Sequence, residues 1–307
     1  MHKEFRQTVW DERLEKDCAA ILRLALAEDL GDWADCTTLA LVGEDVVGRA
    51  AVVARQPGVA AGLPGVRTTL ALLDSRLQWL PQTEDGCRTE KGLCVGIIEG
   101  PARGLLAAER TLLNLLGRLS GVATLTRQYV DLVAHTKARI FDTRKTTPGW
   151  RRLEKYAVRC GGGWNHRGGL GEAVLIKDNH LALGVQASGG GEQFTPADAV
   201  RRAQQFAGQR GDRQMVIEVE VDTLDQLDAV LPARPDIVLL DNMRPAELRE
   251  AVARRNAFDA AIELEASGGV TLDTVRAIAE SGVERISVGA LTHSAVALDF
   301  GLDWMSP

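Results

Sequence analysis

Residues 138–145 read ARIFDTRK, an apolar run that ends in two adjacent cations, Arg144 and Lys145. From this point onward, short β-rich runs alternate with segments of helical length. The later runs are AVLIKDNH (173–180), MVIEVEV (215–221), DIVLLDN (236–242), AIELEASGG (261–269) and RISVGAL (285–291). This alternation is typical of repeated βα units, and nearly continuous apolar runs indicate strands covered on both faces. The second half of the chain is therefore predicted to form a parallel sheet or barrel.

Helix signals separate these runs. Thr195 is a suitable N-cap, Pro196 fits the first helical position, and Gly208 suits a left-handed C-terminal cap. The same logic predicts a helix that begins at Thr147-Pro148 and is capped at Gly161. Further helices are expected at 222–231, 245–256 and 271–281.

The first ~120 residues show a different order of predicted strands and helices. A long amphipathic helix ending at LAEDLG (26–31) and a second helix containing AAERTLLNLLGRL (107–119) flank short predicted strands. These strands are expected near 46–56, 76–80 and 93–99, so this part should be an α+β domain. Residues 184–194, GVQASGGGEQF, are expected to form a glycine-rich surface loop.

Composition narrows the functional class. The 307 residues are 45% apolar with a formal net charge of -6, which argues against a nucleic-acid or anionic-membrane binder. No run approaches the ~20 apolar residues of a membrane span, and MHKEFRQTVWDER lacks the apolar stretch of a signal peptide, so a cytoplasmic location is expected. The five cysteines form no CxxC pair and indicate neither a zinc site nor a disulfide framework.

One segment departs from the acidic average. Residues 139–177 hold nine cations against three anions, not counting His166. A local excess of positive charge in an acidic protein favours a small anionic ligand.

Polar residues and glycines occur near the carboxyl end of every predicted strand. Because these ends form one face of a βα barrel, where active sites are built, the residues should converge. Cations, carboxylates and glycine turns together suit a phosphorylated substrate with a divalent metal. The residues are Arg144, Lys145, Lys177, Glu220, Asp241, Ser267, Gly268, Gly269 and Gly289.

Each feature also has a simpler interpretation. Arg144 and Lys145 would suit a solvated loop, and His166 would suit hydrogen bonding inside its own tight loop. Glu218, Glu220 and Asp222 should share one face of their strand, where buried carboxylates need cationic partners. Glu220 would then form an internal salt bridge with Lys145 or Lys177. The glycines at 161–163 fit either a helix cap or close approach of a ligand to the backbone.

The motifs taken together resemble a known family. They are EDLGDWADCTT (28–38), ERTLLNLLGRLSGVAT (109–124), DTRKTTPGWRRLEKYAVRCGGGWNHRGGL (142–170), VLIKDNH (174–180), EVEVDTLDQLDAVL (218–231), LLDNM (239–243) and ELEASGGV (263–270). Over essentially the whole chain, the sequence is similar to quinolinate phosphoribosyltransferase, also called carboxylating nicotinate-nucleotide pyrophosphorylase. Departures are Ala34, Cys36, Glu172 and a longer loop at 184–194.

The resemblance implies a fold and an activity. An N-terminal α/β sandwich domain, residues 1–120 joined by about 295–307, is expected beside an incomplete, TIM-like βα barrel at 121–294 that holds the active site. The implied reaction combines quinolinate with phosphoribosyl pyrophosphate (PRPP) and yields nicotinate mononucleotide, pyrophosphate and carbon dioxide. Mg2+ is the implied cofactor. A homodimer or higher assembly of dimers is implied, with Arg110 donated across the interface.

The resemblance also implies residue roles. Arg110, Arg144, His166, Arg167 and Lys177 match positions around the carboxylates of quinolinate. Lys145 and Lys177 match positions near the pyrophosphate, while Glu220 and Asp241 match those serving the ribose hydroxyls and Mg2+. The cradle of the 5'-phosphate corresponds to Ser267, Gly268, Gly289 and His293, with Gly269 in the same turn.

Two rival functions stay open at this point. One is a paralogous pyrophosphorylase or nicotinate-type phosphoribosyltransferase that uses another base on the same scaffold. The other is a non-catalytic phosphosugar or nucleotide sensor.

Overall fold

The computed structural model describes residues 3–32, 35–187, 194–212 and 214–305. The chain forms two compact units, each built from separate stretches of sequence. The barrel unit comprises Met1–Gln7, Gln128–Arg144 and Trp164–Ala290, as far as these are described, and the sandwich unit comprises the rest. Within the described residues, no helix is both long enough and apolar enough to cross a membrane.

The sandwich unit is built on an antiparallel sheet in the order β12-β1-β5-β3. Its core consists of buried apolar residues from this sheet and from helices α3 and α4, including Val52, Leu70, Ile98 and Leu112. Its strands are β1 (Val47–Ala54), β2 (Gly58–Val59), β3 (Gln78–Pro81), β4 (Arg88–Thr89), β5 (Cys94–Pro101) and β12 (Phe300–Trp304). Its helices are α1 (Glu12–Leu30), α2 (Cys36–Leu41), α3 (Leu63–Leu73) and α5 (Arg151–Cys160), with most of α4 (Ala102–Val133) and of α11 (Ala290–His293).

Helix α1 shows why the sequence folds this way locally. The Asp11 side chain accepts a hydrogen bond from the Leu14 N–H and caps the first turn, while Gly31 at the C-terminal end has a positive φ of 51°. Leu14, Cys18, Leu22 and Leu26 are buried at a spacing of four residues and form one apolar face.

The barrel unit contains six parallel strands in the order β6-β11-β10-β9-β8-β7. They are β6 (Arg139–Phe141), β7 (Ala173–Ile176), β8 (Val216–Val221), β9 (Ile237–Asp241), β10 (Glu263–Ser267) and β11 (Arg285–Ser287). Each predicted run contains one of them. Because the sheet has two edges, β6 and β7, the barrel is incomplete, and Trp164 forms an isolated bridge to Phe141 on β6.

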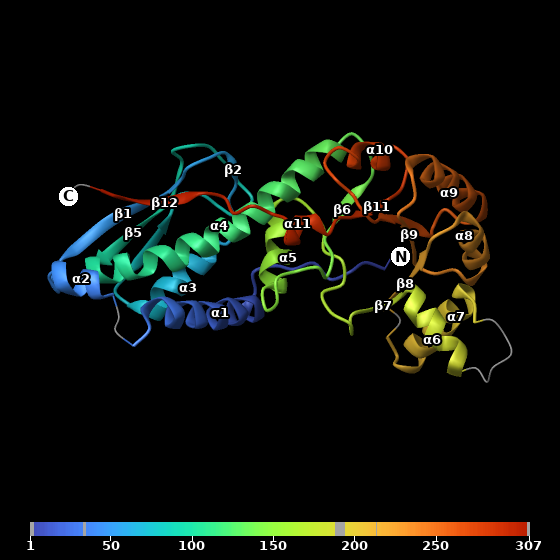
Figure 1. Ribbon diagram of the computed structural model, residues 1–307, viewed down its shortest axis with the longest axis horizontal. Coiled ribbons are helices and arrows are strands. Elements are labelled where there is room, and N and C mark those ends of the chain that lie inside the picture. The colour runs from blue at the N-terminus through green and yellow to red at the C-terminus, as the bar shows by residue number, and fades with distance from the viewer. Residues whose placement is uncertain (1–2, 33–34, 188–193, 213, 306–307) are drawn as a thin grey trace. The chain divides into compact units, whose positions relative to one another are not determined.

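Helices follow the strands of the barrel unit, as Figure 1 shows for α7, α8 and α9. In α7, Thr195 caps the helix, Pro196 opens it, and Thr195 and Asp198 form a reciprocal capping box. The helices are α6 (Asp178–Ala187), α7 (Pro196–Gln209), α8 (Leu224–Val230), α9 (Pro245–Phe258) and α10 (Val275–Ala279), with a short 3-10 turn at Leu231–Ala233.

Three local predictions were wrong. Gly208 lies inside α7, which ends one residue later at Gln209. Helix α5 begins at Arg151 instead of Thr147-Pro148, because Gly149 takes a positive φ of 83° that interrupts a helix, and the left-handed residue at its other end is Gly162, not Gly161. Residues 184–187 of the predicted loop belong to α6, while 188–193 and Ala34 lie outside the described residues.

Candidate active site

The carboxyl ends of the six parallel strands carry most of the predicted site residues. Arg144, Lys177 and Gly289 follow β6, β7 and β11, while Glu220, Asp241 and Ser267 lie on β8, β9 and β10. The register pairs Asp241 directly with Ser267, and Ile176 with Val219 beside Glu220. We call Arg144, Lys177, Glu220 and Asp241 the carboxyl-end rim.

Lys177 and Glu220 touch across the rim. The Nζ atom of Lys177 contacts Oε2 of Glu220, although the lysine side chain is 43% exposed and the glutamate 12%. The predicted internal salt bridge with Lys177 is therefore present. It is compatible with ligand binding, since an exposed lysine can exchange a carboxylate partner for a phosphate.

The β9–β10 corner is shaped by Asn242. Asn242 has a φ of 54°, its side-chain amide donates to Asp241 Oδ2 over 2.7 Å, and its backbone N–H donates to the carbonyl of Ser267 over 2.9 Å. A Cβ at Gly268 would lie 2.1 Å from Asn242 Oδ1, so a side chain is excluded there. Packing against Asn242 thus requires glycine at position 268, whereas the space around Gly269 is open.

Two guanidinium groups, those of Arg144 and Arg167, influence each other in the barrel unit. Arg167 is buried, and its Nη1 donates to the carbonyl of Ala173 over 3.1 Å. Burial, followed by the positive charge of Arg144, lowers the pKa of Arg167. Its Nε is buried without a hydrogen-bond partner among the described residues. Two cations held together in this way form a natural place for an anion.

Asp142 organises the loop that carries these groups. This carboxylate is fully buried, and it accepts hydrogen bonds from the His166 backbone N–H over 2.8 Å and from the Asn165 side chain over 2.6 Å. These hydrogen bonds join two segments of the barrel unit, the one that ends at Arg144 and the one that begins at Trp164. The sequence alone did not indicate this role for Asp142.

Both ring nitrogens of His166 lie against protein groups. Nδ1 accepts the Arg167 backbone N–H over 2.8 Å, while Nε2 lies 2.9 Å from Glu218 Oε2 and 3.6 Å from Glu265 Oε1. The ring also packs on Phe5, with centroids 4.2 Å apart. Hydrogen bonding within its own loop, the simpler interpretation of His166, therefore describes Nδ1, while Nε2 faces the buried carboxylate of Glu218.

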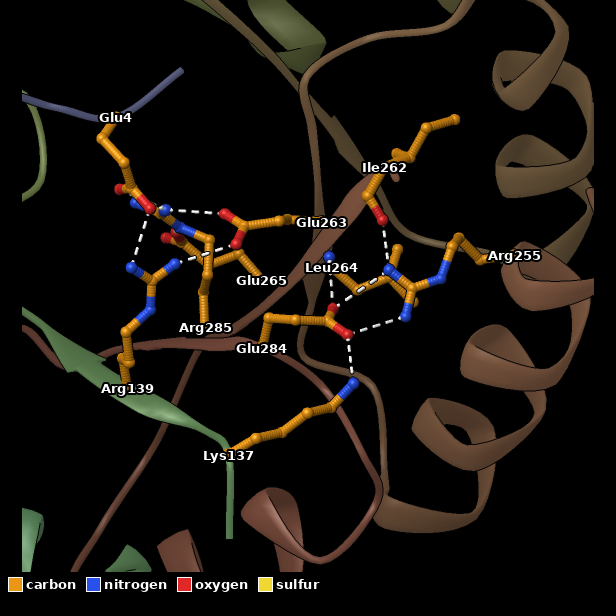
Figure 2. A network of polar contacts seen from close by, with 10 residues as sticks. All are labelled: Glu4, Lys137, Arg139, Arg255, Ile262, Glu263, Leu264, Glu265, Glu284 and Arg285. Carbon is orange, nitrogen blue, oxygen red and sulfur yellow. Dashed lines mark hydrogen bonds and ion pairs between the residues drawn. The ribbon is translucent and has the colours of Figure 1, made fainter. Parts of the chain in front are cut away.

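A second charged cluster lies at the opposite, amino ends of the strands (Figure 2). Arg139 contacts Glu4 and Glu263 over 2.7 and 2.8 Å, and Arg285 contacts Glu263 over 2.9 Å. Arg255 grips Glu284 through two nitrogens, and Lys137 adds a contact of 2.6 Å. We call these residues the amino-end network: Glu4, Lys137, Arg139, Arg255, Glu263, Glu284 and Arg285.

Sequence reasoning missed the buried charges of β10 and β11. Glu265 and Arg285 are completely buried and joined by an Nε–Oε2 contact of 3.0 Å. Burial, followed by the charge of Glu218, raises the pKa of Glu265. The signal was available, because Glu263 and Glu265 alternate with apolar residues in ELEAS just as Glu218 and Glu220 do in VIEVEV.

Two sets of ligand atoms are candidate cation sites. Glu220 and Asp241 offer carboxylates on neighbouring strands at the rim, which suits Mg2+ shared with substrate phosphates. His166, Glu218 and Glu265 also bring ligand atoms within 4.8 Å of one another. That second set is buried beside the guanidinium of Arg285, which already supplies positive charge, and we assign no metal to it.

Three predicted residues belong to the sandwich unit. Arg110 is exposed on α4. Lys145 is exposed, and its carbonyl accepts a hydrogen bond of 2.7 Å from the Thr292 hydroxyl. Thr292 precedes His293, which is also exposed and has Nδ1 2.7 Å from Ser294 Oγ. The segments that carry Lys145 and His293 therefore lie side by side.

Comparison with known proteins identifies the relatives of this chain. Residues 35–120 match the N-terminal domain, and residues 122–303 the C-terminal domain, of quinolinate phosphoribosyl transferase. The nicotinate-nucleotide pyrophosphorylase [carboxylating] of Mycobacterium leprae is 45% identical over 92% of this chain and 95% of its own length. A probable Bacillus subtilis counterpart is 41% identical over 90% of this chain and 89% of its own.

Solved structures agree. The nicotinate-nucleotide pyrophosphorylase of Francisella tularensis superimposes with a TM-score of 0.87 at 34% identity, covering 98% of this chain and all of that one. The two domain matches and the relatives above 40% identity point to the same family, which is consistent with the charged residues at the carboxyl ends of the strands. The chain belongs to the quinolinate phosphoribosyl transferase family.

Proposed function

We propose that this protein transfers the phosphoribosyl group of PRPP to quinolinate with decarboxylation, a step of NAD biosynthesis. The products are nicotinate mononucleotide, pyrophosphate and carbon dioxide. The observation that carries this proposal is the placement of Arg144, Arg167 and Lys177 around one end of a parallel sheet whose rim also bears two carboxylates. Two highly charged anions that repel each other require such a surplus of cations.

The residues divide the work by their chemistry. Arginine forks at 144 and 167 suit the carboxylates of quinolinate, while lysines at 145 and 177 act as point charges toward phosphate. As the bond to pyrophosphate breaks, positive charge develops on the ribose, and the carboxylates of Glu220 and Asp241 stabilise it electrostatically. Ser267, Gly268, Gly269, Gly289 and His293 receive the 5'-phosphate.

The later carbon–carbon cleavage demands little of the protein. Once the pyridine nitrogen is bonded to ribose, the positive charge of the ring stabilises the electron pair left on the ring carbon as the adjacent carboxylate leaves as carbon dioxide, and that carbon then takes up a proton from water. No residue therefore has to supply a strong acid or base at this stage. The role of the site is to hold the ring and exclude competing orientations.

Mg2+ is the proposed cofactor, held by Glu220 and Asp241 together with substrate oxygens. Its contribution would be neutralisation of charge on the departing pyrophosphate. Support comes from the donor set, since two adjacent carboxylates are hard oxygen ligands. The proposed location is cytoplasmic.

The test is product analysis with purified protein. Supplying quinolinate, PRPP and Mg2+ should release carbon dioxide and pyrophosphate in equal amounts with nicotinate mononucleotide. Supplying nicotinate instead should give little turnover. Turnover of nicotinate without carbon dioxide release would favour the nicotinate-type alternative, and binding of PRPP with no turnover would favour a sensor.

Assembly as a homodimer, or as a larger set of dimers, with Arg110 donated to the neighbouring site is part of the proposal. Mixing inactive Arg110→Ala with inactive Lys177→Ala protein should regenerate intact sites after subunits exchange. Random reassociation would restore about a quarter of the sites. Lack of recovery despite proven exchange would remove Arg110 from its role in trans.

A further inference from the structure

A partly buried ion pair in the sandwich unit joins two segments that carry proposed phosphate ligands. Glu154 on α5 is completely buried, and Arg118 on α4 contacts it with Nε over 3.0 Å. We call these two residues the Arg118–Glu154 pair. Neither residue has a place in the chemistry proposed above.

Glu154 fixes the segment that follows Lys145. Its Oε2 accepts the backbone N–H of Thr147 over 3.0 Å, and its Oε1 accepts the Thr147 hydroxyl over 2.7 Å. These bonds hold the turn before α5 in place of the helix that the sequence predicts there. The backbone two residues beyond Lys145 is therefore anchored to a buried carboxylate.

Arg118 fixes the segment around His293. Its Nη2 donates to the carbonyl of Thr292, its Nη1 donates to the carbonyl of Ala295 over 3.0 Å, and Nη2 also lies 3.3 Å from Thr147 Oγ1. The Thr292 hydroxyl completes the connection by donating to the Lys145 carbonyl over 2.7 Å. The guanidinium of Arg118 thus donates to acceptors on the segment at Thr147, on the segment at 292–295 and on α5.

The chemistry explains why an arginine is used. A guanidinium offers five N–H donors in a rigid fork, whereas a lysine offers one flexible point charge. Removing a partner from a satisfied buried pair leaves the remaining charge and carbonyls without compensation. A hydrophobic replacement could fill the volume, but it could not hold two loop segments in register.

We propose that Arg118 and Glu154 are positioning residues that set the spacing between Lys145 and His293 and so determine affinity for PRPP. This inference rests on the proposed function, because it takes Lys145 and His293 as ligands of the phosphate groups. Arg144 and Arg167, matched to quinolinate, belong to the barrel unit. Loss of the Arg118–Glu154 pair should therefore affect one substrate selectively.

The experiment measures both Michaelis constants and the calorimetric Kd for PRPP with Mg2+. Arg118→Lys should raise the KM and Kd for PRPP about tenfold, since one ammonium group cannot replace the bonds from three guanidinium nitrogens to Glu154 Oε1 and to the carbonyls of Thr292 and Ala295. Thr292→Val, a milder change that removes the hydroxyl, should raise them about threefold. The KM for quinolinate should change less than about twofold in both.

Thr126→Val is the matched control, because Thr126 is a buried threonine of α4 whose hydroxyl donates to the carbonyl of Val122 in its own helix. It should leave both Michaelis constants unchanged. Equal effects on the two substrates, or a lower Tm with unchanged PRPP binding, would overturn the inference. Wild-type protein that binds PRPP but releases no carbon dioxide from quinolinate would overturn the proposed function instead, leaving the Kd comparison to decide the positioning role.

Discussion

The two ends of the parallel sheet carry the same kinds of charged side chain but hold them in different ways. At the amino ends, arginines and glutamates are bonded to one another, as in the two-nitrogen contact of Arg255 with Glu284 (Figure 2). At the carboxyl ends, Lys177 reaches a single glutamate and stays 43% exposed. The comparison indicates that the amino-end network serves stability, whereas the carboxyl-end rim keeps its charge accessible for ligands.

The largest expected effect is on activity at the rim. Lys177→Ala should lower kcat/KM about 10³-fold, because the variant loses a cation needed for charge stabilisation in the transition state. Its Tm should stay close to that of the wild type. Lys16→Ala, which removes an exposed lysine of α1, serves as the control and should change neither quantity. Near-normal turnover of Lys177→Ala in a steady-state assay would break the functional half of the comparison.

The next effect is on stability at the amino ends. Arg255→Met should lower the free energy of unfolding by about 3 kcal/mol, since it removes the main partner of a largely buried carboxylate, Glu284. Activity per folded molecule should be retained. Urea titration checks the first quantity, and activity normalised to folded protein checks the second.

Arg254→Met supplies the matched control for that experiment. Arg254 is the neighbouring residue on α9, and it contacts Glu250 and Asp228 at the surface. Its urea midpoint should stay close to the wild-type value, because exposed ion pairs contribute little. A comparable loss of stability in both variants would mean that burial does not distinguish the network.

A third prediction uses pH to separate two glutamates. Burial alone would raise the pKa of Glu284, but hydrogen bonds from Arg255, Lys137 and the Leu264 N–H outweigh it and lower the pKa below its ordinary value. Its ionised form therefore stabilises the fold above the unfolded-state pKa, and this contribution is lost as pH falls through the folded-state pKa. Glu284→Gln should accordingly lose less stability on acidification than the wild type.

Glu265 should show the opposite slope. Because its pKa is raised by burial and by Glu218, its ionisation costs stability as pH rises from the unfolded-state pKa through the folded-state pKa. The stability of Glu265→Gln relative to the wild type should thus improve with rising pH. Unfolding free energies measured between pH 4 and 8 would test both signs, and parallel slopes for the two variants would contradict the assignment.

The smallest effect is expected at the edge of the amino ends. Lys3 contacts Asp236 over 2.9 Å with about a quarter of each side chain exposed. Lys3→Met should lower the free energy of unfolding by less than ~1 kcal/mol, because solvent screens a partly exposed pair. A loss comparable with that of Arg255→Met would extend the stabilising network to this residue.

The strands of the barrel unit were predictable because continuous apolar runs leave few alternatives. Each run from ARIFDTRK to RISVGAL contains a strand, and the polar residues at its end reach the rim. Helix boundaries were less predictable, since they depended on backbone conformation. Gly149 interrupts the expected start of α5, whereas Gly208 is tolerated inside α7.

The site was predictable where a residue type stands out from an apolar strand, as at Lys177 and Glu220. It was not predictable where a charge has a partner distant in sequence. In the sequence, Glu154 looks like an ordinary residue of an amphipathic helix. In the structure it is buried, and its partner Arg118 lies 36 positions earlier in the chain. Glu265 similarly depends on Arg285 and on Glu218 of another strand. Such pairings arise from tertiary structure and leave no local pattern.

The contact between Glu4 and Arg285 also bears on how the protein is made. These residues are separated by 281 positions, and their side chains meet over 3.2 Å within the barrel unit. During translation, Glu4 leaves the ribosome long before its partner is synthesised. The free-energy cost of closing a loop grows only with the logarithm of its length, so this long loop is not prohibitive. The contact must nevertheless form late, because Arg285 is synthesised late. Final assembly of the barrel unit is therefore expected after β11 has emerged from the exit tunnel.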